Sequence, residues 1–271
     1  MTMPIAQPTP YAEVNVVLGE WVAGVQRILG AGLRGIYLYG SLALGDFTPH
    51  RSDIDVVVVT AGELADEQTA ALQALHTDLA ARWVPWGAEL EVSYMPQPAL
   101  RRYDPAHARY PSIERGERLV VEEHNSRGFI QRHVLREHGI TLVGPPIREQ
   151  IDPVDPDDLR RDVRAIAREW LAALRADPLP LRHQGYQGYV VMTICRMLYT
   201  LQFGTVVSKP TACRWAREAL DPRWAPLIDR ALAEDLEETR DLIAYALDRL
   251  QADEQPGADT PGTQAGSSSP S

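Results

Sequence analysis

Residues 53–60, "DIDVVVVT", constrain the fold more than any other part of the chain. The β-branched run from Val56 to Val59 is typical of a strand that is buried on both faces of a sheet. Asp53 and Asp55 stand at its start, where charged groups are costly unless they are paired. Side chains two residues apart in a strand point to the same face, so we expect these two carboxylates to lie side by side.

Paired carboxylates require a cation. They repel each other, and both stay ionised only when a positive charge lies between them. Magnesium suits such a site because it prefers oxygen ligands and often bridges carboxylates to phosphates. Glu91 lies in a further predicted strand, residues 88–96, at a separation that fits a helix connecting neighbouring strands. Three carboxylates would hold one or two metal ions and leave a base beside a hydroxyl. Taken alone, Asp53 and Asp55 are also compatible with a solvated strand end and an ion pair in a turn.

A glycine-serine pair, Gly40 and Ser41, precedes the aspartates by about eleven residues. It follows an expected strand, residues 34–40, and precedes a short expected helix in residues 42–47. Backbone N–H groups and a hydroxyl at such a place can hold an anion. This spacing from the aspartates is more specific than either element alone.

The pattern of strands and helices predicts an α+β protein with two domains. The first half reads as strand, short helix, strand, helix and strand, which predicts a mixed sheet with helical cover in residues 1–152. From there the apolar spacing is helical, which predicts an all-α bundle in residues 153–252. Residues 253–271 offer almost nothing to bury, and we expect a disordered tail.

Composition excludes several classes of protein. The net charge of −10 argues against binding of nucleic acid, which needs many basic side chains to replace counter-ions. The sequence contains no run of about 18 apolar residues, so we expect no membrane span. The N-terminal residues do not resemble a secretory signal. Cys195 and Cys213 lack metal-ligand spacing, so we expect reduced cysteines and a cytoplasmic location.

Residues 39–59, "YGSLALGDFTPHRSDIDVVVV", closely resemble the signature of the DNA polymerase β-like nucleotidyltransferase superfamily, Gly-Ser followed by Asp-x-Asp. Within it, the chain resembles the aminoglycoside adenylyltransferases that modify streptomycin and spectinomycin. The resemblance extends to "LEVS" at 90–93, "REHGITLVGP" at 136–145, "DPVDPDDL" at 152–159 and the segment 189–220. It covers most of residues 30–235.

The resemblance implies roles for the acidic residues. Asp53 and Asp55 would bind two magnesium ions that carry ATP, and Glu91 would be the general base that takes the proton of the acceptor hydroxyl. Glu91 is also a candidate third ligand of the metal, because it belongs to the same expected cluster.

The resemblance also implies the contacts to the nucleotide. Ser41 and the Gly40 backbone would hold the triphosphate, Lys209 would reach the phosphates from the helical domain, and Arg196 would add a second cation. Lys209 is the single lysine among 27 basic residues. A flexible ammonium at this position fits the need to neutralise phosphate charge. Arg196 fits equally well as a partner of an acidic neighbour.

The acceptor is less defined. The streptomycin-modifying relatives have an aromatic residue after a glutamate where this chain has Glu123 and His124. They also have an aspartate before the apolar helix, where this chain has Tyr186 and no acid. A polycationic acceptor calls for carboxylates. Four glutamates are candidates, either for this role or as a solvated helix surface: Glu114, Glu117, Glu122 and Glu123.

Together these features predict a magnesium-dependent enzyme that transfers AMP from ATP to a hydroxyl of an aminoglycoside or aminocyclitol such as spectinomycin. It would release pyrophosphate, act as a monomer and confer antibiotic resistance. Two alternatives remain at this stage. The acceptor could be a protein or another natural product, or the chain could be a regulator that binds a nucleotide without transferring it.

Overall fold

The computed structural model describes residues 7–49, 52–124, 128–177, 184–233 and 245. The expected tail, residues 253–271, lies outside the described residues. No helix in the described part of the chain is both long and apolar enough to cross a membrane.

The first part of the chain forms a six-stranded mixed sheet within the described residues, in the order β5-β4-β3-β2-β1-β6. Only β2 and β3 are parallel among these pairs, and the other neighbours are antiparallel. The strands are β1 (Leu33–Leu38), β2 (Ile54–Thr60), β3 (Leu90–Pro96), β4 (Arg109–Ile113), β5 (Val120–Glu123) and β6 (Ile140–Val143).

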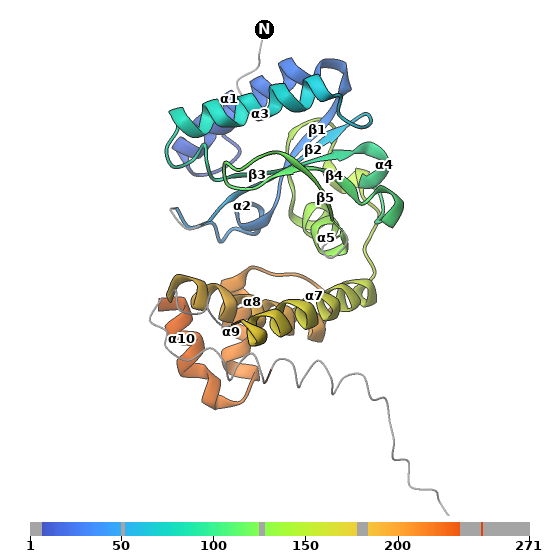
Figure 1. The fold of residues 1–271 in the computed structure, drawn as a ribbon. Coiled ribbons are helices and arrows are strands. Elements are labelled where there is room, and N and C mark those ends of the chain that lie inside the picture. The colour runs from blue at the N-terminus through green and yellow to red at the C-terminus, as the bar shows by residue number, and fades with distance from the viewer. Residues whose placement is uncertain (1–6, 50–51, 125–127, 178–183, 234–244, 246–271) are drawn as a thin grey trace, which may run out of the picture.

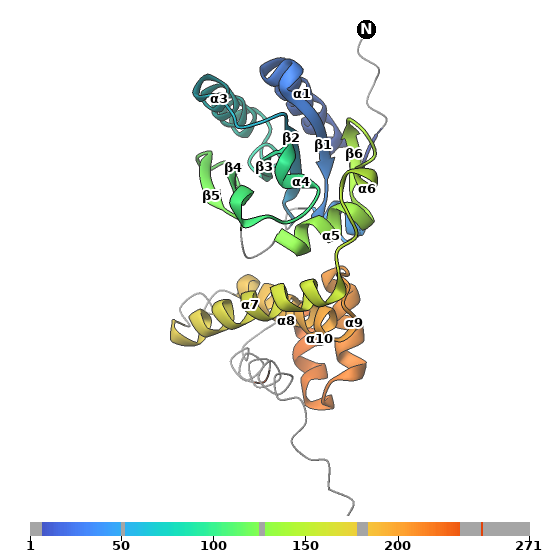
Figure 2. The ribbon, with the colours of Figure 1, turned by 90° about the vertical axis from the view of Figure 1, so that its right-hand side faces the viewer.

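Helices cover the sheet on both faces, as Figures 1 and 2 show. Alternate residues of β2 explain this arrangement, since Val56 and Val58 face one apolar core and Val57 and Val59 face the other. The longer helices α1 and α3 cover the first face, and α5 lies between the second face and the rest of the chain. The helices of this part are α1 (Ala12–Leu29), α2 (Gly40–Leu44), α3 (Asp66–Arg82), α4 (Gln97–Leu100), α5 (Gly128–His138) and α6 (Ile147–Gln150).

Two features of the sheet differ from expectation. Strands β4 and β5 form a hairpin that the sequence pattern did not predict, and they extend the sheet beyond β3. The four glutamates interpreted above as a possible helix surface are on this hairpin. Glu122 and Glu123 are in β5, and Glu114 and Glu117 are in the connecting turn. The helical alternative for them is wrong, because antiparallel pairing with β4 holds this segment extended.

The second part of the chain consists of helices and short connecting loops in its described residues. Its core is formed by apolar side chains of four helices, with Val190, Ile194 and Cys213 fully buried at the centre. Both cysteines are free thiols inside this core. The helices are α7 (Pro156–Ala176), α8 (Gln184–Phe203), α9 (Lys209–Ala219) and α10 (Ala225–Ala233).

The two parts are in direct contact. A small apolar cluster joins Val134 of α5, Leu159 of α7 and Val206 of the loop before α9. Polar contacts support it: His133 Nε2 lies 3.1 Å from the Thr205 hydroxyl. The Phe129 N–H donates to Asp162 at 3.1 Å. These contacts hold α7 and the α8–α9 loop against α5.

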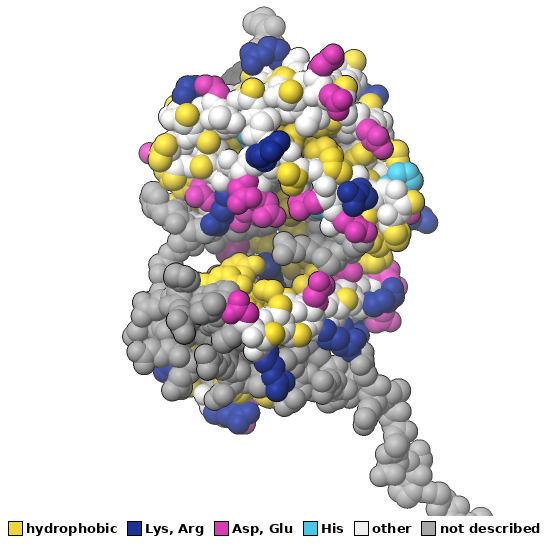
Figure 3. All heavy atoms as spheres, viewed as in Figure 1, with side chains coloured by type: hydrophobic (Ala, Val, Ile, Leu, Met, Phe, Trp, Pro, Cys, Tyr) yellow, Lys and Arg dark blue, Asp and Glu magenta, His cyan; other side chains and the backbone are white. Residues whose placement is uncertain are grey.

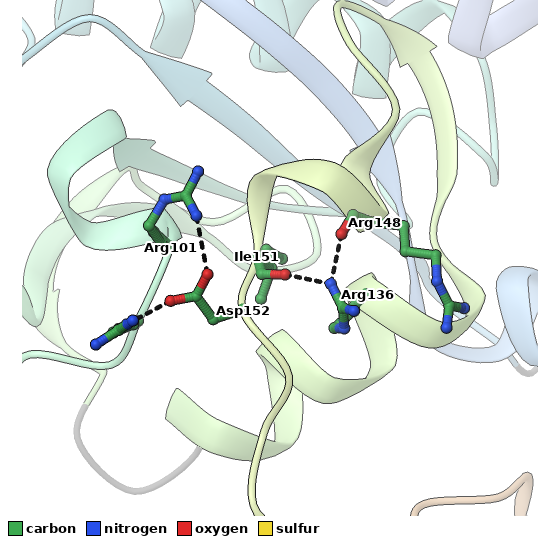
Figure 4. A network of polar contacts seen from close by, with 6 residues as sticks. Arg101, Arg136, Arg148, Ile151 and Asp152 are labelled. Carbon is green, nitrogen blue, oxygen red and sulfur yellow. Dashed lines mark hydrogen bonds and ion pairs between the residues drawn. The ribbon is translucent and has the colours of Figure 1, made fainter.

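The chain leaves the sheet part at an anchored point (Figure 4). Asp152 pairs with Arg101 at 2.8 Å and also with Arg102, whose hydrogen bond is the main cause that lowers the pKa of Asp152. Arg136 of α5 donates to the carbonyl oxygens of Arg148 and Ile151. We propose a domain boundary directly after Asp152, because these contacts tie that residue to the sheet part.

Candidate active site

Three carboxylates meet at one end of the parallel strand pair. In the register of β2 and β3, Asp55 lies directly beside Glu91, and Asp53 comes one residue before β2. One ligand oxygen from each of the three residues lies within 4.8 Å of the others. Both strands therefore present their acids to the face of the sheet that looks toward α5 and the helical part. This donor set fits a hard divalent cation such as Mg²⁺.

Gly40 allows the backbone to approach these carboxylates. It begins α2 with φ +59°, a conformation that glycine adopts at little cost. A Cβ atom at this position would overlap the carboxylate of Asp55. The Tyr39 N–H also donates to the Asp55 carbonyl at 3.1 Å. Glycine is thus required where the chain turns from β1 into α2. The helix includes Gly40 and Ser41, whereas the sequence pattern placed its start after them.

Burial and mutual repulsion disfavour the anionic forms of Asp55 and Glu91. Burial, and then the charge of Asp53, raises the pKa of Asp55 to about 7. Burial is also the main cause that raises the pKa of Glu91, to about 8, followed by the charges of Asp53 and Asp55. A bound divalent cation would offset this repulsion, and its binding would release protons.

These shifts predict an unusual pH dependence of stability. Because the folded pKa values exceed the unfolded ones, the folded state binds more protons, and stability falls as pH rises. We expect the metal-free protein to lose stability between about pH 4 and about pH 8, the interval between the ordinary and the raised pKa values. Saturating MgCl₂ should restore the melting temperature, and most strongly at pH 8. Thermal melts across this range, with and without MgCl₂, check the prediction. An equal effect of MgCl₂ at pH 5 and pH 8 would contradict it.

Two cations from the helical part face the carboxylates. Burial lowers the pKa of Lys209 to about 8, and the charge of Arg196 acts in the same direction, while Asp53, Asp46 and Asp55 oppose it. Arg196 and Lys209 also lower the pKa of Asp55 by their charge. The Lys209 ammonium lies 4.2 Å from the ring centroid of Tyr189, a cation–π contact. Lys209 and Arg196 thus lie close enough to the acids to influence them electrostatically.

A hydrogen bond across 163 residues helps to place Lys209. Its backbone N–H donates to the Asp46 carboxylate at 3.2 Å, and Asp46 directly follows the turn after α2. Ser208 caps the same helix, accepting from the Thr211 N–H at 3.3 Å. The start of α9 is therefore held both by its own cap and by the sheet part. Asp46 was not a candidate in the sequence analysis, because only the folded chain brings it beside Lys209.

Ser41 shows a free hydrogen-bonding capacity. Its backbone N–H donates to the Asp55 side chain, which lowers the pKa of Asp55. Its hydroxyl is buried and has no hydrogen-bond partner in the structure. An orphaned hydroxyl is costly in a folded protein unless a ligand or water satisfies it. Its presence beside the carboxylates fits a phosphate oxygen that would accept from it.

The candidate acceptor residues lie on two different parts of the fold. Glu123 ends β5 and pairs in register with Arg109 of β4. His124 follows it, and its ring stacks on Tyr110 with centroids 3.9 Å apart. Tyr186 lies on α8, where its ring stacks on Tyr189 at 5.8 Å. Tyr186 is therefore one aromatic ring away from Lys209, while His124 packs against the sheet.

The surface view agrees with this arrangement. Figure 3 shows acidic side chains gathered along the lower edge of the sheet part, above a hollow that separates it from the helical part. The facing edge of the helical part is mostly hydrophobic in the same view. The charge visible along this edge of the sheet part is mainly negative.

One charged neighbour was missed by the sequence analysis. Arg115, in the turn between β4 and β5, has its Nε 3.4 Å from Glu91 and its Nη2 3.7 Å from Asp53. The only available signal was the sequence Glu-Arg-Gly-Glu at 114–117, which favours a tight turn. Without the hairpin, nothing placed that turn beside the carboxylates.

Two family models match successive parts of the chain. Residues 24–107 match the family described as "Nucleotidyltransferase domain", and residues 149–254 match "Aminoglycoside adenylyltransferase, C-terminal domain". The chain is thus similar to nucleotidyltransferases in its first part and to aminoglycoside adenylyltransferases in its second part. The resemblance drawn from the Gly-Ser and Asp-x-Asp pattern is thereby confirmed.

Curated relatives of the family cover most of the chain. An aminoglycoside (3'') (9) adenylyltransferase of Escherichia coli is 29% identical over 252 residues, which are 89% of this chain and 92% of that protein. A spectinomycin 9-adenylyltransferase of Campylobacter jejuni is 26% identical over 223 residues, 79% of this chain and 82% of that protein.

A solved structure shares the fold. The spectinomycin adenyltransferase AAD(9) from Enterococcus faecialis, solved with ATP and spectinomycin, superposes with a TM-score of 0.68 at 17% sequence identity. The match covers 87% of this chain and 98% of that one. The predicted fold class, a mixed-sheet nucleotidyltransferase domain followed by a helical region, is confirmed.

Proposed function

We propose that this protein is a magnesium-dependent enzyme that transfers AMP from ATP to a hydroxyl of an aminocyclitol or aminoglycoside, with spectinomycin as the first candidate. The observation that carries the proposal is the cluster of Asp53, Asp55 and Glu91 within 4.8 Å, faced by Lys209 from the other part of the chain. Names of the relatives support the same reaction, since they are aminoglycoside and spectinomycin adenylyltransferases.

The three carboxylates would have two roles, metal binding and general-base catalysis. Asp53 and Asp55 would hold two Mg²⁺ ions, with Glu91 as a further ligand. When bound, the metal supplies charge neutralisation on the phosphates. Glu91 would accept the proton of the acceptor hydroxyl as a general base. Burial, the main cause of its raised pKa in the metal-free protein, favours the protonated form and so supports this role.

The nucleotide would lie between the two parts of the chain. The Ser41 hydroxyl, with the Gly40 backbone, would contact the triphosphate, and Lys209 and Arg196 would neutralise it from the helical part. The acceptor oxygen forms a bond to the α-phosphorus, the bond from that phosphorus to the bridging oxygen breaks, and pyrophosphate leaves. Lys209 has an advantage here, because anionic phosphates would favour the charged form of an ammonium whose pKa burial has lowered.

The acceptor would enter beside Glu91. The acidic edge seen in Figure 3 suits a molecule that carries amines. We assign Glu123, His124 and Tyr186 to the acceptor side as part of this proposal. Their positions support the assignment unequally: Tyr186 lies on the aromatic stack that ends at Lys209, and His124 is stacked on Tyr110. We further propose a cytoplasmic monomer, where ATP is available and the two thiols stay reduced.

Pyrophosphate release tests the proposal. We expect release from ATP and Mg²⁺ to depend on spectinomycin, with a product whose mass equals acceptor plus AMP minus water. Streptomycin, run separately, tests the acceptor range, and the variant Asp53→Asn serves as the inactive control. Tight binding of ATP with Mg²⁺, but no release with any aminocyclitol or aminoglycoside, would contradict this acceptor class. That result would favour a protein acceptor or a regulator that only binds the nucleotide.

A further inference from the structure

Arg115 places a guanidinium against the carboxylate cluster. Its Nε lies 3.4 Å from Glu91 and 3.6 Å from Glu89, and its Nη2 lies 3.7 Å from Asp53. All three distances exceed the 2.7–3.2 Å of a well-made N–H···O bond. The side chain is also 54% exposed. Arg115 is therefore a loosely held counter-charge and not a fixed structural bridge.

The backbone at this position is unusual. Arg115 has φ +39°, and it is the one non-glycine residue with a positive φ among those that the structure describes. Gly116 follows with φ +74°, and the Glu117 N–H donates to the Glu114 carbonyl at 2.8 Å. Such turns favour glycine, asparagine or aspartate, and an arginine there costs more. A strained residue beside a candidate site points to a role for its side chain.

Several cations lie near the cluster. The charges of Lys209 and Arg196 act on Asp55, and Lys209 also interacts with Asp53. Arg115 lies on the side of Asp53 and Glu91. A divalent cation bound to those same oxygens would stand within a few ångströms of the guanidinium and repel it. The arginine and the metal therefore exclude each other from this side of the cluster.

We propose that Arg115 is a tethered counter-cation that competes with free divalent cations for Asp53 and Glu91, so that the site takes up metal together with the nucleotide. This inference rests on the proposed function, in which these carboxylates hold the metal. The triphosphate relieves the competition in two ways. Its negative charge offsets the repulsion, and its oxygens offer the displaced guanidinium another partner.

Binding of Mn²⁺ to the nucleotide-free protein, measured by electron paramagnetic resonance, tests the competition without relying on activity. Arg115→Gln should tighten Mn²⁺ binding by about five- to tenfold, the sum of a few weak ion pairs. The matched control is Arg118→Gln. It removes the same charge three residues further along the same exposed loop. Among the described ion pairs, Arg118 makes none with the cluster, so its effect should stay below about twofold.

A second titration, with a non-hydrolysable ATP analogue present, tests the link to the nucleotide. Arg115→Gln and the wild type should then bind Mn²⁺ with nearly equal affinity. A difference that stays unchanged would overturn the joint uptake of metal and nucleotide. Unchanged Mn²⁺ affinity in nucleotide-free Arg115→Gln, or an equal gain in Arg118→Gln, would overturn the competition itself.

The variant Asp53→Asn separates this inference from the proposed function. If the wild type binds Mn²⁺, Asp53→Asn does not, and Arg115→Gln matches the wild type, only the role of Arg115 fails. If neither the wild type nor Arg115→Gln binds Mn²⁺, with or without the nucleotide analogue, the metal site fails and both proposals fall with it.

Discussion

Replacing Asp55 with asparagine is expected to abolish turnover while making the metal-free protein more stable. Loss of turnover follows because Asp55 would lose its charge at the point where Asp53, Asp55 and Glu91 converge. Metal catalysis supplies several kcal/mol of transition-state stabilisation, so the rate should fall by about 10³-fold or more. We expect Mn²⁺ binding to weaken in parallel.

The gain in stability has a different origin. Burial and Asp53 make ionised Asp55 unfavourable in the folded chain, and asparagine removes that charge. It still offers an oxygen to the Ser41 N–H. At pH 8 without metal, we expect a gain on the order of 1 kcal/mol, which raises the melting temperature by roughly 2–4 °C. At pH 4 the gain should vanish, because Asp55 is then protonated in the wild type.

Thermal melts and pyrophosphate assays on the same preparations check both parts of this prediction. Asp53→Asn is the variant for comparison. It also removes a carboxylate from the cluster, but at a position one residue before the buried strand. Full activity in Asp55→Asn would refute the assigned metal role. A fall in stability at pH 8 would show that Asp55 serves the fold, and that its charge is well compensated by Lys209 and Arg196.

The second large effect is expected for Glu91→Gln. The amide is close in size to the carboxylate but cannot accept the hydroxyl proton, and general-base catalysis contributes about 10²- to 10⁴-fold. We expect kcat to fall by that factor, while binding of ATP with Mg²⁺ changes little because Asp53 and Asp55 remain.

Glu89→Gln is the control for Glu91→Gln, since Glu89 lies two residues earlier and also faces Arg115, but is not part of the three-carboxylate group. Equilibrium binding of a fluorescent ATP analogue, measured beside single-turnover rates, separates the two roles of Glu91. A loss of nucleotide affinity as large as the loss of rate would mean that Glu91 acts mainly as a metal ligand. In that case the base must be sought elsewhere.

Local patterns were informative where the chemistry depends on spacing along the chain. The period of two in a strand put Asp53 and Asp55 on one face, and a helix-length separation put Glu91 on the neighbouring strand. The structure has that parallel pair with Asp55 beside Glu91. Lys209 was identified through its resemblance to the family and its status as the single lysine, and it does face these acids.

Patterns failed where pairing partners are distant or weakly marked. Strands β4 and β5 are short, and exposed residues such as Val120 and Val121 give them no alternating pattern. Only pairing with β3 and with each other defines them. The interpretation of the surrounding glutamates as a helix surface failed for this reason.

The amino-acid sequence by itself determined the fold class, the family resemblance and the set of carboxylates, because these follow from local periodicity and from a specific motif. Only the tertiary structure decided which other charged residues lie beside these carboxylates. Asp46 reaches Lys209 across 163 residues, and the hairpin turn brings Arg115 to Glu91. Such contacts depend on the packing of whole elements, and the energy of a charge depends on its burial and on neighbours that no local pattern specifies.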